Sequence, residues 1–227
     1  MKTFREFLYE GVNDPGIFKA IFLAGGPGSG KTFIADRTLP NSALGLKVVN
    51  TDEALEFLLK KSGLSSNMLT MTPDELERFA ENRVQAKRII AAKKRGFLNG
   101  RLGMIIDGTG QKFDKIEREQ KELKDVGYDT FMVFVNTSLE VALERNQNRP
   151  RKVDEKIVID LWKKVQGNIG KFQTLFGTAN FAIVDNNDVT EDALLKTFKR
   201  AKKFVSRPPT SRLAKTWIAS ERAKQRR

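Results

Sequence analysis

Short apolar runs alternate with longer amphipathic stretches along most of this chain. The apolar runs cover residues 18–24, 46–50, 102–106, 130–135 and 181–184, and each predicts a buried β-strand. Between them, Thr72, Pro73 and Glu75 have the residue types and spacing of a helix start. The apolar residues that then fall on one helical face are Leu76, Phe79, Ala80, Ala86 and Ile90. Strands that alternate with helices predict an α/β fold with a parallel sheet covered on both faces.

The two ends of the chain differ from this central pattern. Residues 1–10 have the pattern of a short amphipathic helix, and residues 11–16 (GVNDPG) form a loop signal. After about residue 205 the apolar residues become sparse, although Trp217 and Ile218 could dock weakly. We therefore predict an N-terminal helix and loop over residues 1–16, a main domain over 17–205 and a peripheral tail over 206–227. A further helix is expected to start at Thr137, with Glu140 three residues later.

Composition excludes several classes of protein and of catalytic site. Hydrophobic residues make up 40% of the 227 residues and charged residues 30%, which fits a globular chain with a sizeable core. No apolar run approaches the roughly 18 to 20 residues of a membrane span, and no secretory signal is present. Cysteine and histidine are absent, which excludes disulfides, thiolate sites and imidazole bases. Acid–base chemistry must therefore rest mainly on carboxylates.

The net charge of +13 is concentrated at the C-terminal end. Residues 199–227 hold eleven Lys or Arg and one acid, which leaves about +3 for the rest of the chain. A basic tail of this kind predicts contact with nucleic acid or another polyanion. The alternative is a tail that is simply solvated.

A phosphate-binding loop is the strongest chemical signal. It consists of Gly25, Gly26, Pro27, Gly28, Ser29, Gly30, Lys31 and Thr32, which fit G-x-x-x-x-G-K-[ST] between a predicted strand and a helix. Backbone amides of such a loop face the phosphates of a nucleotide such as ATP. We expect Lys31 to reach the β- and γ-phosphates and the Thr32 hydroxyl to hold Mg²⁺. The alternative is a chance glycine-rich turn.

Two aspartates follow predicted strands at the edge where such a nucleotide would bind. Asp52 follows the second strand and could accept the proton of an attacking hydroxyl. It could instead only cap the next helix, as Thr51 also could. Asp107 ends the third strand in MIIDGTG, a position that supports Mg²⁺ directly or through water in P-loop enzymes. The alternative for Asp107 is an ordinary turn residue.

A basic run, LERNQNRPRK, predicts a lid over the nucleotide. Arg145 and Arg149 are four residues apart on one predicted helical face, and Pro150 breaks that helix before Arg151. Arginines at such a junction can close over ATP and stabilise the transferring phosphoryl group. The alternative is a solvated basic face.

Together, GGPGSGKT, VNTDEAL, MIIDGTG and VNTSLEVALERNQNRPR resemble the zeta-toxin and polynucleotide-kinase-like P-loop kinases over roughly residues 18–200. The resemblance implies a P-loop NTPase fold with a five-stranded parallel sheet, use of ATP and Mg²⁺, Asp52 as base, and Arg145 and Arg149 as lid arginines. It also implies a kinase whose acceptor is a hydroxyl of a nucleotide, nucleotide sugar or polynucleotide end. The alternatives are an ATP-dependent nucleic-acid-binding protein and a packaged head protein with a vestigial kinase fold.

The first ten residues, MKTFREFLYE, resemble the capsid-targeting leaders of internal head proteins in large tailed phages. This resemblance implies cleavage by a prohead protease after Glu10, and a protein found in the host cytoplasm or packaged in the virion head. The alternative is a helix that packs on the kinase domain.

Overall fold

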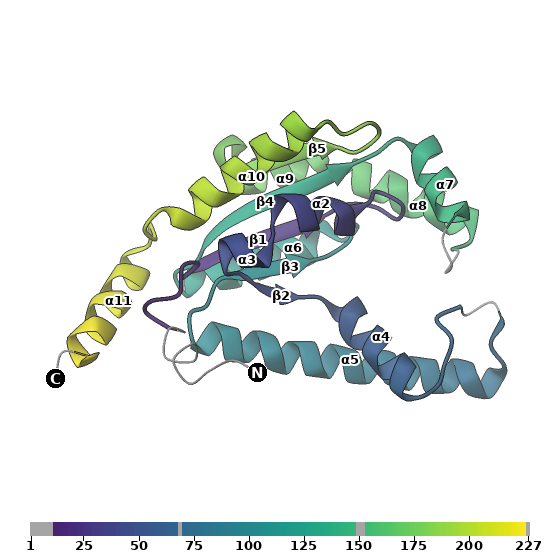
Figure 1. Ribbon diagram of the computed structural model, residues 1–227, viewed down its shortest axis with the longest axis horizontal. Helices are drawn as coiled ribbons and strands as arrows, with labels where there is room; N and C mark the ends of the chain where they lie inside the picture. The colour runs from purple at the N-terminus through teal and green to yellow at the C-terminus, as the bar shows by residue number, and fades with distance from the viewer. Residues whose placement is uncertain (1–10, 68–69, 149–152, 226–227) are drawn as a thin grey trace.

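A central parallel sheet organises the molecule (Figure 1). The computed structural model describes residues 11–67, 70–148 and 153–225. The strands are β1 (Lys19–Ala24), β2 (Lys47–Val49), β3 (Met104–Asp107), β4 (Asp129–Asn136) and β5 (Phe181–Asp185). Their order in the sheet is β2-β3-β1-β4-β5, and every neighbouring pair is parallel. The predicted α/β fold with a five-stranded parallel sheet is confirmed, and each strand lies within two residues of its predicted bounds.

Helices cover both faces of this sheet because successive strand residues point to opposite sides. On one face, Ile21 and Leu23 of β1 pack in a cluster with α2 (Lys31–Thr38), α3 (Asn41–Leu44) and α10 (Glu191–Ser206). On the other, Phe22 packs with α6 (Phe113–Asp125), α9 (Ile169–Phe176) and residues of α8 (Glu155–Gln166) and α11 (Arg212–Gln225). A 3₁₀ turn, η2 (Thr178–Asn180), leads into β5. The three layers leave the carboxyl ends of the strands along one edge.

Two helices form a separate arm beside the β2 edge of the sheet (Figure 1). They are α4 (Thr51–Lys61) and α5 (Pro73–Asn99), which share an apolar cluster of Leu55, Leu58, Leu59, Leu64, Phe79 and Ala86. The predicted apolar face of α5 is only partly correct, since Leu76 and Ala80 are exposed. The reason is that α5 packs against α4 over part of its surface and does not lie flat on the sheet.

Helix capping agrees with the sequence at one position and differs at another. Thr72 caps α5 in a complete capping box with Glu75, as predicted. The predicted start at Thr137 is wrong by one residue, because Ser138 caps α7 (Leu139–Gln147) by accepting from the Val141 amide. The Thr137 hydroxyl instead donates to Asn187 Oδ1 at 3.1 Å.

The last segment of the chain is helical and packs on the domain. Ala214 of α11 is fully buried, and the Trp217 ring lies edge-on to Phe18 with centroids 5.5 Å apart. Trp217 and Ile218 both pack on the core, as the sequence suggested. The division at residues 16 and 205 remains a prediction. Within the described ranges, each helix is too short or too polar to cross a membrane.

Candidate active site

The glycine-rich loop turns sharply between β1 and the first turn of α2. Gly28 and Gly30 have φ angles of +73° and +76°, a region that favours glycine. A Cβ on Gly28 would lie 2.4 Å from the carbonyl oxygen of Ala142, so the loop packs directly against α7. The loop therefore has the backbone shape and the strand–helix setting that the sequence motif requires.

Lys31 and Thr32 open helix α2 directly after this loop. The Lys31 Nζ donates a hydrogen bond to the Gly25 carbonyl oxygen at 3.0 Å, which folds the side chain back over the loop. Thr32 is exposed. The predicted roles of Lys31 toward phosphates and of Thr32 toward a cation remain predictions.

Asp107 occupies the last position of β3, the strand next to β1. Its Oδ2 accepts a hydrogen bond from Asn50 Nδ2 at 3.0 Å, while its Oδ1 is buried without a hydrogen-bond partner. Burial raises the pKa of the Asp107 carboxyl above its usual range; the Lys31 ammonium opposes this shift, and the Asp52 and Glu53 carboxylates add to it. Asp107 is thus a partly buried acid with one buried oxygen that has no hydrogen-bond partner.

Asp52 lies in the first turn of α4 and is exposed. The alternative in which Asp52 or Thr51 caps this helix is wrong, because Asn50 is the cap: its Oδ1 accepts from the Asp52 amide at 2.8 Å. The Asp52 carboxylate is therefore not used for capping. Its charge acts on the Asp107 carboxyl, which places the two acids at the same edge of the sheet.

Arg145 on α7 is linked to the phosphate loop through Asn186, the residue that follows β5. Its Nη2 donates to the Asn186 carbonyl oxygen at 2.8 Å, and Asn186 Nδ2 donates to the Ser29 carbonyl oxygen at 2.7 Å. A Cβ on Gly30 would lie 3.5 Å from Arg145 Nη1, which is buried without a hydrogen-bond partner. Helix α7 ends at Gln147, and the predicted lid residues Arg149 and Arg151 lie outside the described residues.

Buried polar atoms without partners concentrate around the loop. In the described part of the chain there are four such side-chain atoms, and three of them are Ser29 Oγ, Asp107 Oδ1 and Arg145 Nη1. A buried polar atom left unpaired costs roughly 1–3 kcal/mol, so such atoms call for a ligand. A carboxylate oxygen suits a cation, and a guanidinium beside phosphate-loop amides suits an anion. This donor set fits a nucleotide with Mg²⁺.

A cleft of about 490 Å³ opens from Asp107 between α5 and α6. We call it the α5–α6 cleft. Its charged wall residues besides Asp107 are Arg83, Lys87, Lys94, Lys112, Lys115 and Glu119. Lys94 forms an ion pair with Glu119, and the four other cations make the cleft electropositive. It therefore suits a negatively charged molecule that reaches the strand ends.

Sequence reasoning missed two asparagines of this site. Asn50 orients Asp107, and Asn186 ties the phosphate loop to Arg145. Each directly follows a strand, β2 or β5, at the carboxyl edge of the sheet, where ligands bind in open α/β folds. Their position after a strand was thus a usable signal.

Comparisons with known proteins agree with this geometry. Residues 15–192 match the family profile of zeta toxin. A protein from Chloroflexus aurantiacus that is assigned as a kinase has a similar structure, with a TM-score of 0.52, 14% identity, and coverage of 82% of this chain and 96% of that chain. A structure from the PezAT toxin–antitoxin system of Streptococcus pneumoniae has a TM-score of 0.51, 16% identity, and coverage of 95% and 93%. At these identities the structural likeness shows the fold alone. No curated protein sequence matches the chain significantly.

Proposed function

Because the chain belongs to the zeta toxin family and is a phosphotransferase acting on a hydroxyl acceptor, we propose that it transfers the γ-phosphoryl group of ATP to a nucleotide, a nucleotide sugar or a polynucleotide end. The observation that supports this most is the group of unpaired buried atoms on Ser29, Asp107 and Arg145 around an intact phosphate loop. Bound phosphates and a cation would supply the interaction partners that these buried atoms lack.

In this proposal the loop amides and Lys31 bind the β- and γ-phosphates. Arg145 stabilises the charge that develops on the transferring group, because its Nη1 lies beside Gly30 and is not otherwise bonded. Asn186 holds the phosphate loop and Arg145 in place relative to each other through its hydrogen bonds with Ser29 and Arg145. Arg149 and Arg151 would extend this cationic lid.

Thr32 and Asp107 would hold Mg²⁺, which neutralises phosphate charge when it is bound. The unpaired Oδ1 of Asp107 fits this role, and Asn50 donates a hydrogen bond to the other oxygen. The raised pKa of Asp107 also fits, since a carboxylate that is costly to bury alone gains most from a cation.

Asp52 would act as the base. The acceptor oxygen attacks the γ-phosphorus, the bond between that phosphorus and the β–γ bridging oxygen breaks, and ADP leaves with the electron pair. The acceptor proton passes to the Asp52 carboxylate, which is exposed and free of a capping role. The three acceptor classes all carry phosphate, which the cations of the α5–α6 cleft can bind.

The test is incubation of the full chain with γ-labelled ATP and separate pools of nucleotides, nucleotide sugars, DNA ends and RNA ends. We expect label in the product of one pool and none with Lys31→Ala. Label released only as inorganic phosphate would favour an ATPase without an acceptor. Absence of ATP binding would favour a vestigial fold.

Packaging in a virion remains a separate proposal. The leader that suggests it, residues 1–10, lies outside the described residues. It predicts that protein recovered from particles has the mass of a chain beginning at Gly11. A full-length mass in particles, or no protein there, would leave a kinase of the host cytoplasm.

A further inference from the structure

Cations crowd the last two helices of the molecule. Residues 193–225 hold ten Lys or Arg and one acid, Glu221. Lys196 pairs with Asp192 and Lys224 with Glu221. Within the described residues, eight cations of this segment have no ion pair: Lys199, Arg200, Lys202, Lys203, Arg207, Arg212, Lys215 and Arg222. We call these eight residues the α10–α11 surface.

All eight cations are exposed, although Arg200 already donates to the Thr178 and Phe181 carbonyl oxygens. The inner side of α10 is made by Leu194, Ala201 and Phe204, which are buried in the core. The inner side of α11 is made by Ala214, Trp217 and Ile218, which pack on the other core cluster. The inner apolar side of α11 is thus already covered, and its exposed side is mainly polar and basic apart from Leu213, which is 61% exposed.

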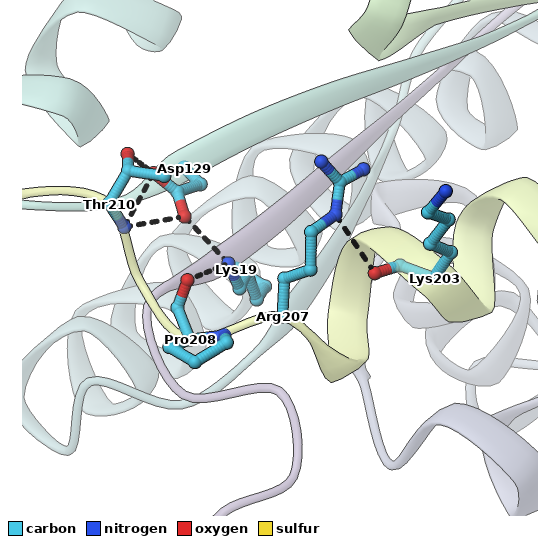
Figure 2. A network of polar contacts seen from close by, with 6 residues as sticks. All are labelled: Lys19, Asp129, Lys203, Arg207, Pro208 and Thr210. Carbon is cyan, nitrogen blue, oxygen red and sulfur yellow. Dashed lines mark hydrogen bonds and ion pairs between the residues drawn. The ribbon is translucent and has the colours of Figure 1, made fainter.

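A polar network fixes the segment that joins the two helices (Figure 2). Lys19, which is 2% exposed, forms an ion pair with Asp129 at 2.6 Å and also approaches the Pro208 carbonyl oxygen at 3.5 Å. The Thr210 amide donates to Asp129 Oδ2 at 3.1 Å, and the Thr210 hydroxyl donates to Oδ1. Because this connection is anchored to β1 and β4, the two helices that carry the cations are held in one arrangement. Residues 206–225 thus include a helix that packs on the domain, while their cations are exposed to solvent.

A groove of about 430 Å³ lies between the end of α10, α11 and the loop before β1. Three cations of the α10–α11 surface line it: Arg207, Lys215 and Arg222. No acid lines it among the described residues, and its remaining wall is largely apolar, with Val12, Ile17, Val205, Pro208, Pro209 and Ile218. The groove therefore offers apolar contact inside and positive charge around it.

We propose that the α10–α11 surface and this groove bind single-stranded nucleic acid. Unpaired cations along helices of roughly 24 and 21 Å, at 1.5 Å per residue, suit the phosphates of a linear polyanion. The aliphatic and proline side chains of the groove offer apolar contact to an unstacked base. A membrane surface fits less well, because the apolar side of α11 packs on Phe18 and is not available for insertion.

This surface is distinct from the candidate active site. Helix α11 contacts Phe18 and Gly127, which precede β1 and β4, whereas the phosphate loop follows the other end of β1. The six residues of β1 separate the two by about 20 Å at 3.3 Å per residue. The surface would hold a strand whatever the acceptor is, so this inference does not rest on the proposed function.

The test is fluorescence anisotropy of a labelled 20-nucleotide single strand with the full chain over about 50–200 mM salt. The triple variant Arg207→Ala, Lys215→Ala, Arg222→Ala is compared with Lys60→Ala, Lys61→Ala, Lys93→Ala, which removes equal charge from exposed positions on the α4–α5 arm. We expect the first triple variant to bind the strand at least about tenfold more weakly than wild type. The plot of log affinity against log salt concentration should also become less steep by about 2, because each of the three lost phosphate contacts contributes roughly 0.7. The second triple should bind within twofold of wild type.

Equal losses in both triples would show that overall charge alone attracts the strand and would overturn the proposal. Tighter binding to vesicles with phosphatidylserine, or to polyglutamate, than to the strand would overturn it in favour of a membrane or an acidic protein. Melting temperature and ATP affinity are measured for each variant. Unchanged values with lost strand binding would support the α10–α11 surface even if no acceptor were phosphorylated.

Discussion

At the amino end of the sheet, the buried ammonium of Lys19 meets the Asp129 carboxylate, and both Asp129 oxygens also accept from Thr210 (Figure 2). At the carboxyl end, Asp107 uses one oxygen and leaves the other buried and unpaired, and Arg145 leaves Nη1 unpaired beside the phosphate loop. The same strands thus end in a satisfied polar network on one side and an incomplete one on the other. The fully hydrogen-bonded amino end stabilises the fold, and the carboxyl end, with its unpaired buried atoms, is suited to bind a ligand.

One unpaired buried atom lies away from the carboxyl end. Arg101 Nε is also buried without a partner, and its guanidinium lies 5.7 Å from the Phe18 ring, away from the phosphate loop. Arg101 stands alone there, whereas Ser29 belongs to the phosphate loop, Arg145 lies beside Gly30 of that loop, and Asp107 pairs with Leu23 on the strand that leads into it. Convergence of several unpaired groups, more than the presence of one, marks the site.

The largest effect is expected from breaking the satisfied end. Asp129→Asn leaves the ammonium of Lys19 buried without its charge partner, and removing one member of a buried pair costs about 3–5 kcal/mol. Urea unfolding should show this loss, while the turnover of the molecules that remain folded stays near wild type. Asp125→Asn is the matched control, because its ion pair with Lys121 is exposed. A large loss of turnover in folded Asp129→Asn would mean that the two ends are not separate in function.

Lys31→Ala should weaken ATP binding by about 10²-fold or more, because it removes the charge that faces the phosphates. The fold should remain, since Lys31 lies in the loop-facing turn of α2 outside the core. Calorimetric titration with ATP measures the change. Arg37→Ala on the same helix, where the side chain pairs with exposed Glu191, is the control and should bind normally. Equal ATP affinity in folded Lys31→Ala would contradict the role of the loop.

Asn186→Ala should weaken ATP binding by about tenfold, because it removes the donor that holds the Ser29 carbonyl and leaves that carbonyl without this partner. Asn187→Ala, one residue along, removes bonds to Thr137 and Ser138 and should have a smaller effect on ATP. If both variants bind ATP equally, Asn186 has no specific part in positioning the loop.

Asp107→Asn should raise the stability of the ligand-free chain slightly, by about 2 °C in Tm, although it impairs transfer. The raised pKa means that the Asp107 carboxyl binds its proton more tightly in the folded chain than in the unfolded chain. The free energy of unfolding therefore falls as the pH rises through that pKa, and the ionised carboxylate destabilises the folded chain at neutral pH. The amide removes this loss and can still accept from Asn50. Thermal unfolding across pH measures this change. A Tm that falls by several degrees at neutral pH would contradict the conclusion that the ionised Asp107 carboxylate destabilises the ligand-free chain.

The strands and the phosphate loop could be predicted because short runs of consecutive residues determine them. Five apolar runs define the strands, and eight consecutive residues define the phosphate loop. The helix cap at Asn50 was missed because Thr51 and Asp52 are equally good capping types, and only the backbone geometry selects among them. The contact of Asn186 with Ser29 spans 157 residues, so the order of the strands had to be known first. The exposure of Leu76 depends on how the α4–α5 arm packs beside the sheet, and the helical spacing of apolar residues does not predict that packing.

The central claim is that the incomplete carboxyl end transfers a phosphoryl group to a hydroxyl with Asp52 as base. Single-turnover transfer from γ-labelled ATP to the acceptor pool that becomes labelled tests it directly, with Asp52→Asn compared against Glu53→Gln in the same helical turn. We predict transfer at least about 10²-fold slower in Asp52→Asn, because an amide cannot take the proton, with ATP affinity within about twofold and Glu53→Gln near wild type. Transfer by Asp52→Asn within about threefold of wild type would contradict the claim.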